Sequence, residues 1–313
     1  MKILEFGDKS KRKIILIHGF QSPWQVWEKY IEHFKNDFHI IVPVMSGHNQ
    51  EKVEEFVSFE DDAKQIEDFV ISNYGKDVFA IFGMSMGGVL TATLWQNANL
   101  NFEKVIFDGS PLVSYNSFMK KFMTNFYLDV THKTQKRDKK TLNQANAICP
   151  KACFDSFLKL LDNMSDSTIK NCINGIADFK LKTDIDVTGT ILYYFYGTAM
   201  NEMLAKKSAK VIKKYYANSV VKCFKGKSHC ENSLFNADVM ILELEKIFNI
   251  KLNKLTFKIL RNVLISYGIN EGNVSDMVNK FLNSSTSFIP IIGSLVEMGV
   301  QGTVNAFLTA RIG

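Results

Sequence analysis

Short apolar runs alternate along the chain with longer segments in which apolar residues recur three and four positions apart. The runs are rich in Val, Ile, Phe and Tyr, which is typical of strands. Seven strands are predicted, at residues 2–6, 13–18, 38–44, 77–83, 104–109, 191–197 and 219–224. The helical spacing predicts helices at 24–36, 51–74, 86–98, 201–217 and 231–248.

The predicted strands are continuously apolar, without the half-polar alternation of a solvent-exposed sheet. Continuous apolar strands that alternate with helices are typical of a mostly parallel sheet, covered on both faces and joined by right-handed crossovers. We therefore expect an α/β fold with a doubly wound sheet.

The interval between the strands that end at Gly109 and begin at Ile191 is far longer than an ordinary crossover. Residues 112–190 are predicted to form about four helices, inserted into the sheet domain as a cap. Aromatic and Met residues at helical spacing are expected to form the core of this cap, with pocket lining as the alternative. The basic stretch "THKTQKRDKK" at 131–140 is expected to be a solvated helix face or loop.

Residues 251–313 follow the last element of this α/β pattern and are predicted to form a C-terminal extension of three short helices. The stretch 288–313 is apolar but contains Pro290, Glu297 and Gln301, which disfavours a single bilayer-spanning helix. Packing within the extension, peripheral membrane contact and a partner site stay open. The predicted domains are thus 1–250 and 251–313.

Composition narrows the class of protein further. With 46% hydrophobic and 22% charged residues in 313, the chain is expected to be globular. The net charge of +6 comes from scattered basic residues without a nucleic-acid-binding motif, so no nucleic-acid partner is expected. Five cysteines without paired spacing and an N-terminus without an apolar signal core predict free thiols and a cytoplasmic protein. No metal or other cofactor is expected.

Three glycines surround Ser85 in "GMSMGG" at 83–88, directly after a predicted strand and before a predicted helix. This G-x-S-x-G context predicts a nucleophile elbow, in which glycines relieve crowding around a strained serine. The turn would raise the Ser85 hydroxyl above the carboxyl edge of the sheet and direct the Met86 N–H at a developing oxyanion. A plain Gly-rich connection, or a phosphate loop without its lysine, is the alternative.

The order of motifs over roughly residues 1–250 resembles the α/β-hydrolase superfamily, in particular its capped serine hydrolases of esterase or lipase type. The motifs are "IHGF" at 17–20, "SGHNQ" at 46–50, "GMSMGG" at 83–88, "DGSP" at 108–111 and "GKSHCE" at 226–231. The resemblance implies that the Phe20 and Met86 amides form an oxyanion hole and that His229 is the base for Ser85.

His18, His48 and Met84 are candidate substrate-binding residues, and for the two histidines bracing of the loops is favoured over substrate contact.

The acid that orients His229 is expected after the strand at 191–197. The usual position, three residues beyond the strand's glycine, holds Met200 in this chain. Glu202, the first carboxylate after that strand, is the favoured acid, and Asp108 at the end of the preceding strand is the alternative. Glu202 could also serve only as a first-turn acid of the next helix.

Together these residues predict a serine hydrolase that cleaves a carboxylic ester or thioester of a small-to-medium apolar acyl substrate through an acyl-enzyme. The alternative is a catalytically silent hydrolase-fold protein that binds a ligand or acts as a scaffold, with its C-terminal helices on a membrane or partner. A strained serine turn favours the enzyme, because a binding protein has no physical need for it.

Overall fold

The computed structural model describes residues 1–250 and 254–266, in which seven strands form one sheet in the order β1-β3-β2-β4-β5-β6-β7. Strand β1 runs antiparallel to β3, whereas the pairs β2–β3, β2–β4, β4–β5 and β5–β6 are parallel. The α/β prediction and all seven predicted strands are confirmed. The strands are β1 (Lys2–Phe6), β2 (Lys13–Ile17), β3 (His39–Val44), β4 (Asp77–Met84), β5 (Asn101–Asp108), β6 (Ile191–Gly197) and β7 (Val220–Phe224).

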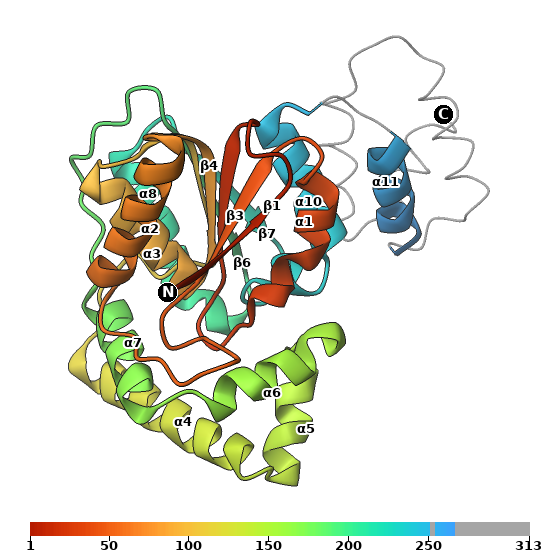
Figure 1. Cartoon of the computed structure of the whole chain (residues 1–313). Helices are drawn as coiled ribbons and strands as arrows, with labels where there is room; N and C mark the ends of the chain where they lie inside the picture. The colour runs from red at the N-terminus through yellow and green to blue at the C-terminus, as the bar shows by residue number, and fades with distance from the viewer. Residues whose placement is uncertain (251–253, 267–313) are drawn as a thin grey trace, which may run out of the picture. The chain divides into compact units, whose positions relative to one another are not determined.

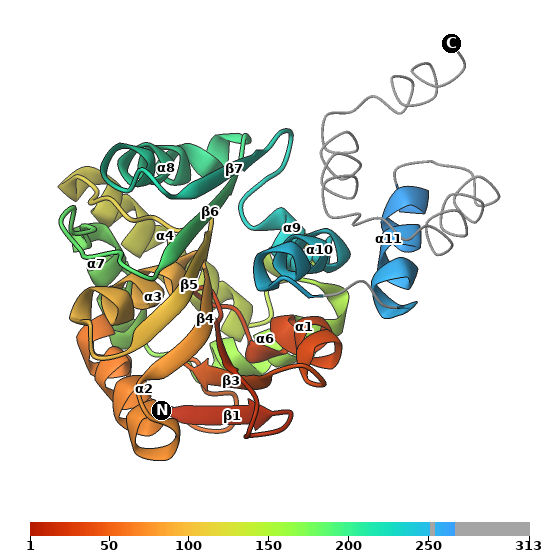
Figure 2. The same ribbon diagram turned by 90° about the horizontal axis from the view of Figure 1, so that it is seen from above.

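Helices cover both faces of this sheet, with α2, α3 and α8 on one face and α1 on the other (Figure 1, Figure 2). The helices outside the β5–β6 interval are η1 (Trp24–Trp27), α1 (Glu28–Phe34), α2 (Phe59–Tyr74), α3 (Met86–Asn97), η3 (Met200–Glu202), α8 (Met203–Tyr215), α9 (Glu231–Leu234), α10 (Ala237–Phe248) and α11 (Lys254–Ser266). Within that interval lie α4 (Ser117–Gln135), α5 (Lys139–Ile148), η2 (Lys151–Cys153), α6 (Phe154–Asp162) and α7 (Asp166–Asp178).

Helix α3 directly follows Ser85 and is largely apolar on all sides. Its residues from Met86 to Trp95 are all buried, because α2 covers one side while β4 and β5 lie against the other. Buried side chains from the strands beneath it, among them Ile81 and Phe107, complete this part of the core. The strand-to-helix turn before α3 is therefore held between two rigid elements.

One predicted helix start was wrong. The spacing over 51–74 predicts a single helix, but α2 begins at Phe59, after the Ser58 hydroxyl accepts a hydrogen bond from the Asp61 amide. The Phe56 amide donates instead to Thr168 Oγ1 of α7, at 3.0 Å, so it is not available for a helical ladder. Residues 51–58 form an extended connection that contacts the inserted helices.

A second difference is a break in the helix predicted at 231–248. The structure has two helices, α9 and α10, separated at Phe235 and Asn236. The amides of both residues donate to the Glu231 carbonyl, and Asn236 leaves the helical region with φ −121° and ψ 46°. Helix α9 therefore ends at Leu234, and α10 begins at Ala237.

The helices α4 to α7 lie between β5 and β6 and sit over the carboxyl ends of the parallel strands (Figure 1). The predicted helical insertion at 112–190 thus consists of four α-helices and one short 3-10 turn. Helix α4 packs against α7 and α6 and contributes Thr131 and Thr134 as buried residues. This insertion therefore lies at the edge of the sheet where β4 and β5 end (Figure 1).

The described residues fall into two compact units. One contains 1–223 and 227–230, and the other contains 224–226, 231–250 and 254–266. The division into domains at residue 250 stays a prediction. Among the described residues, none of the helices combines the length and apolar character that a bilayer crossing requires. The stretch 288–313, for which peripheral membrane contact is one of the three open alternatives, lies outside the described residues.

Candidate active site

Ser85 occupies the turn between β4 and α3, half-buried at the carboxyl edge of the sheet. Its backbone has φ 50° and ψ −118°, a region that non-glycine residues rarely adopt. The turn is fixed on both sides, because the Ser85 amide donates to the Asp108 carbonyl at 2.8 Å and the Gly88 amide donates to the Ser85 carbonyl at 3.0 Å. The serine hydroxyl therefore projects from a constrained bend.

The three glycines around Ser85 are required by close packing. A Cβ atom on Gly83 would lie 2.3 Å from Thr91 Oγ1, and one on Gly87 would lie 2.4 Å from the His18 carbonyl oxygen. A Cβ atom on Gly88 would lie 1.7 Å from Ser110 Oγ. Each contact is far below van der Waals separation, so only glycine lets β4, α3 and the neighbouring strands close around the serine.

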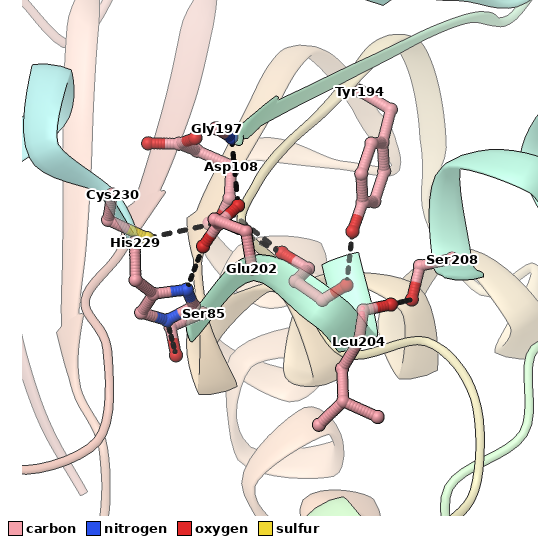
Figure 3. A network of polar contacts seen from close by, with 11 residues as sticks. Ser85, Asp108, Tyr194, Gly197, Glu202, Leu204, Ser208, His229 and Cys230 are labelled. Atoms are coloured by element: carbon pink, nitrogen blue, oxygen red, sulfur yellow. Dashed lines mark hydrogen bonds and ion pairs between the residues drawn. The ribbon is translucent and has the colours of Figure 1, made fainter. Parts of the chain in front are cut away.

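His229 lies in the loop that follows β7, and its ring sits beside the serine (Figure 3). The Nε2 atom is 2.9 Å from Ser85 Oγ. The next residue, Cys230, has φ 50° and donates its thiol hydrogen to the Asp108 carbonyl at 3.3 Å, which ties this loop to the end of β5. The structure thus brings together Ser85 and His229, which are 144 positions apart in the sequence.

Glu202 completes the contact on the other side of the imidazole. Its Oε1 atom lies 2.5 Å from His229 Nδ1, and its Oε2 atom accepts the Gly197 amide at 2.9 Å (Figure 3). The side chain is fully buried. Burial raises the pKa of this carboxyl, but the hydrogen bond and charge of His229 and the Gly197 amide outweigh it, so the pKa lies below its ordinary value. Glu202 is therefore ionised at neutral pH.

Asp108, the alternative acid, has a different place in the same network. It is buried at the end of β5, and its main-chain carbonyl accepts hydrogen bonds from the Ser85 amide and the Cys230 thiol. The carboxylate hydrogen-bonded to His229 is that of Glu202. Asp108 thus fixes the backbone of the two loops that carry the serine and the histidine.

The two main-chain amides predicted to form the oxyanion hole belong to residues near the serine turn. Met86 is the first residue of α3, and Phe20 belongs to the loop after β2. That loop lies against the serine, since a Cβ atom on Gly19 would be 3.4 Å from Ser85 Cβ. The hydrogen bonds formed among the described residues use neither the Phe20 nor the Met86 amide. Their role as donors to a substrate oxygen stays a prediction.

His18 and His48 hold two loops together by reciprocal hydrogen bonds. His18 Nε2 accepts the Met45 amide from the loop after β3, and His48 Nε2 accepts the Gln21 amide from the loop after β2, each at 3.2 Å. Each Nδ1 faces a main-chain carbonyl, that of Gly19 for His18 and that of Ser46 for His48. Nδ1 must therefore carry the ring proton in both. We call this pair the histidine clasp.

Burial keeps both rings of the histidine clasp neutral. It lowers the pKa of His18 to about 4 and that of His48 to about 3. Both side chains are fully buried, and Met84, the third predicted substrate residue, is buried in β4. The histidines therefore brace the loops, and substrate contact by His18, His48 and Met84 stays a prediction.

Sequence reasoning missed Gln21 and Tyr127, which connect the loop after β2 to the insertion. Gln21 has φ 53°, and its side-chain amide donates to Thr131 Oγ1 of α4 at 2.7 Å. The Tyr127 ring, also on α4, meets the Phe20 ring edge-on with centroids 4.9 Å apart. Neither residue belongs to a motif, so no local signal in the sequence could have identified them.

No metal-binding group of His, Cys, Asp and Glu side chains occurs in the described part of the chain. Its cysteines are free thiols, of which Cys149, Cys153, Cys172 and Cys230 are buried. The arrangement around Ser85 therefore consists of hydroxyl, imidazole, carboxylate and main-chain amides.

Part of the sequence matches a family of known proteins. The sequence model of the family described as "alpha/beta hydrolase fold" matches residues 13–143. No curated protein matches the sequence.

Solved structures agree with this match. A putative alpha/beta hydrolase family protein from Desulfitobacterium hafniense is 16% identical with a TM-score of 0.62, covering 79% of this chain and 100% of that one. A hydrolase from Pseudomonas aeruginosa PA01 is 12% identical with a TM-score of 0.64, covering 79% and 93%. An esterase from Exiguobacterium antarcticum is 16% identical with a TM-score of 0.60, covering 78% and 94%. The chain has the α/β-hydrolase fold, as the resemblance seen in its sequence implies.

Proposed function

We propose that this protein is a serine hydrolase that cleaves carboxylic esters or thioesters with a small-to-medium apolar acyl group. The observation that carries the proposal is the continuous contact from Ser85 Oγ to His229 Nε2, at 2.9 Å, and from His229 Nδ1 to Glu202 Oε1, at 2.5 Å. A serine hydroxyl is a weak nucleophile and needs a base within hydrogen-bond reach. His229 meets this requirement.

In the acylation step, His229 Nε2 accepts the Ser85 proton while Ser85 Oγ forms a bond to the carbonyl carbon of the substrate. The carbonyl oxygen becomes an oxyanion that the Phe20 and Met86 amides stabilise. Collapse of this intermediate expels the alcohol or thiol, which takes the proton from His229. The ionised Glu202 holds Nδ1 protonated throughout and stabilises the imidazolium.

In the deacylation step, His229 removes a proton from water, and the hydroxide attacks the acyl-serine carbonyl at the same two amides. Collapse releases the carboxylic acid and returns the proton to Ser85. The aromatic rings of Phe20 and Tyr127, next to the oxyanion amide, favour an apolar acyl group. Esterases among the proteins with similar folds are consistent with this chemistry.

Labelling with a fluorophosphonate, followed by hydrolysis of p-nitrophenyl esters of increasing acyl length, tests the proposal. Wild type should be labelled and should hydrolyse at least one ester, and Ser85→Ala should lose both properties. Ser110→Ala is the matched control, because this buried serine lies beside the elbow and its hydroxyl donates to the Gly83 carbonyl. Absence of labelling on folded wild type would instead support the silent binding protein.

A further inference from the structure

Helix α4 exposes a row of three phenylalanines to solvent. Phe118, Phe122 and Phe126 lie four positions apart and are 80%, 56% and 50% exposed. Residues at this spacing share one face of a helix, so the row extends over about 12 Å of the helix axis. The rings of Phe122 and Phe126 stack with their centroids 6.4 Å apart. An exposed aromatic row of this kind is unusual on a protein surface that contacts only water.

The same helix and the residues after it carry strong positive charge. Segment 117–140 contains seven Lys or Arg residues and two Asp residues, a net charge of +5, whereas the whole chain carries +6. Lys120, Lys133 and Arg137 form ion pairs with Asp178, Asp129 and Asp162. The remaining four lysines are exposed or partly exposed and form no ion pair with a described residue; they are Lys121, Lys136, Lys139 and Lys140.

The opposite side of α4 is already packed. Met123, Tyr127 and Leu128 lie against the core, and Thr131 and Thr134 are buried. The phenylalanine row therefore stands on a helix that cannot rotate to bury it. Because Tyr127 contacts Phe20, this helix also reaches the loop that holds one predicted oxyanion amide.

We propose that segment 117–140 docks on anionic lipid surfaces, with Phe118, Phe122 and Phe126 inserted between the headgroups and the lysines beside the lipid phosphates. A helix with aromatic residues on one face and Lys or Arg at its polar positions is the arrangement that binds in the plane of a lipid–water interface. The net charge of +5 around the row favours an anionic lipid surface over a second copy of this chain, because each copy carries +6 and two copies repel each other. The negative headgroups complement the four unpaired lysines.

The docking proposal depends only on this surface and is independent of the proposed function. Delivery of an acyl substrate from the lipid to Ser85 would in addition rest on the proposed function.

Vesicle flotation of the full chain tests docking separately from catalysis. It uses vesicles of phosphatidylcholine with phosphatidylglycerol and vesicles of phosphatidylcholine alone. The variants are Phe118→Ser/Phe122→Ser/Phe126→Ser, Lys136→Gln/Lys139→Gln/Lys140→Gln, and Phe235→Ser as a matched control, since Phe235 is 48% exposed elsewhere in the chain.

Wild type, Phe235→Ser and Ser85→Ala should float with the anionic vesicles, and the triple phenylalanine variant should bind them about tenfold or more weakly. The lysine variant should lose its preference for anionic over neutral vesicles, and added salt should weaken wild-type binding. The proposal is overturned if wild type does not bind, or if the triple phenylalanine variant binds as wild type does. Self-association that the triple variant abolishes, without vesicle binding, would assign the row to a second copy of the chain.

Discussion

His229 Nδ1 lies 2.5 Å from Glu202 Oε1, and separate main-chain hydrogen bonds fix the loops that carry these two residues. The amides of Thr198 and Ala199 donate to the Lys227 carbonyl at 3.0 and 3.1 Å. The loop after β6 and the loop after β7 are therefore bonded directly to each other. A carboxylate held in this way keeps the imidazole in one tautomer and one orientation.

Replacing this carboxylate should affect turnover much more than binding. Glu202→Gln should lower kcat for ester hydrolysis about 10³- to 10⁴-fold, because an amide neither stabilises the imidazolium nor keeps the proton on Nδ1. Steady-state kinetics on a p-nitrophenyl ester measure kcat, and circular dichroism verifies the fold. Asp108→Asn is the matched control and should retain most of kcat. A larger loss for Asp108→Asn than for Glu202→Gln would make Asp108 the acid.

Replacing a glycine of the nucleophile elbow should lower the unfolding free energy of the protein. Gly88→Ala places a Cβ atom 1.7 Å from Ser110 Oγ, and overpacking of this kind costs about 1–3 kcal/mol of unfolding free energy. Adding Ser110→Gly removes the clashing side chain, so the double variant should recover part of the loss. Urea titration followed by tryptophan fluorescence measures this, because all three tryptophans lie within residues 1–223. If the changes in unfolding free energy of the two single variants simply add in the double variant, the Cβ atom at position 88 does not clash with the Ser110 side chain.

Strand positions were readable from the sequence because parallel strands buried on both faces are continuous apolar runs. The start of α2 was not readable in the same way. Phe56 fits the helical spacing, yet its amide is hydrogen-bonded to Thr168, more than a hundred positions away. The periodicity of one segment contains no information about such a distant acceptor.

The candidate site shows the same limit. Ser85 and His229 were identified because each follows a strand in a recognisable motif. Glu202 and Asp108 stayed alternatives, since both follow strands whose carboxyl ends meet at one edge of the sheet. The 3-10 turn Met200–Glu202, which carries Glu202 to the imidazole, depends on hydrogen bonds between two loops. Spacing alone does not encode these bonds.

The histidine clasp should influence turnover through the Phe20 amide. His48 Nε2 accepts the amide of Gln21, the residue next to Phe20. His48→Phe removes this acceptor and should lower kcat about tenfold with little change in KM, a smaller effect than complete loss of an oxyanion donor. His48→Gln can still accept a hydrogen bond and should retain more activity. The control His33→Phe exchanges another buried histidine, on α1, and should leave kcat unchanged. If KM instead rose about tenfold and kcat stayed unchanged, His48 would be a residue that contacts the substrate.

A buried carboxylate on α2 should make stability depend on pH. Asp62 is almost fully buried, and its Oδ2 atom accepts the Ser46 amide at 3.1 Å. Burial raises its pKa from 3.8 to about 6, although the hydrogen bonds with Ser46 and the charge of the Met1 amino group lower it. The ionised form is therefore disfavoured in the folded state but not in the unfolded chain.

The sign of the effect follows from this difference. Between the two pKa values the folded state binds a proton that the unfolded chain does not, so this group increases the unfolding free energy as the pH falls from about 7 to about 4. Asp62→Asn removes this titration. The unfolding free energy of the variant minus that of wild type should therefore be greater at about pH 7.5 than at about pH 4.5, by about 1–3 kcal/mol. Urea titrations of both proteins at the two pH values measure the difference. A difference that is independent of pH would show that Asp62 titrates alike in the folded and unfolded states.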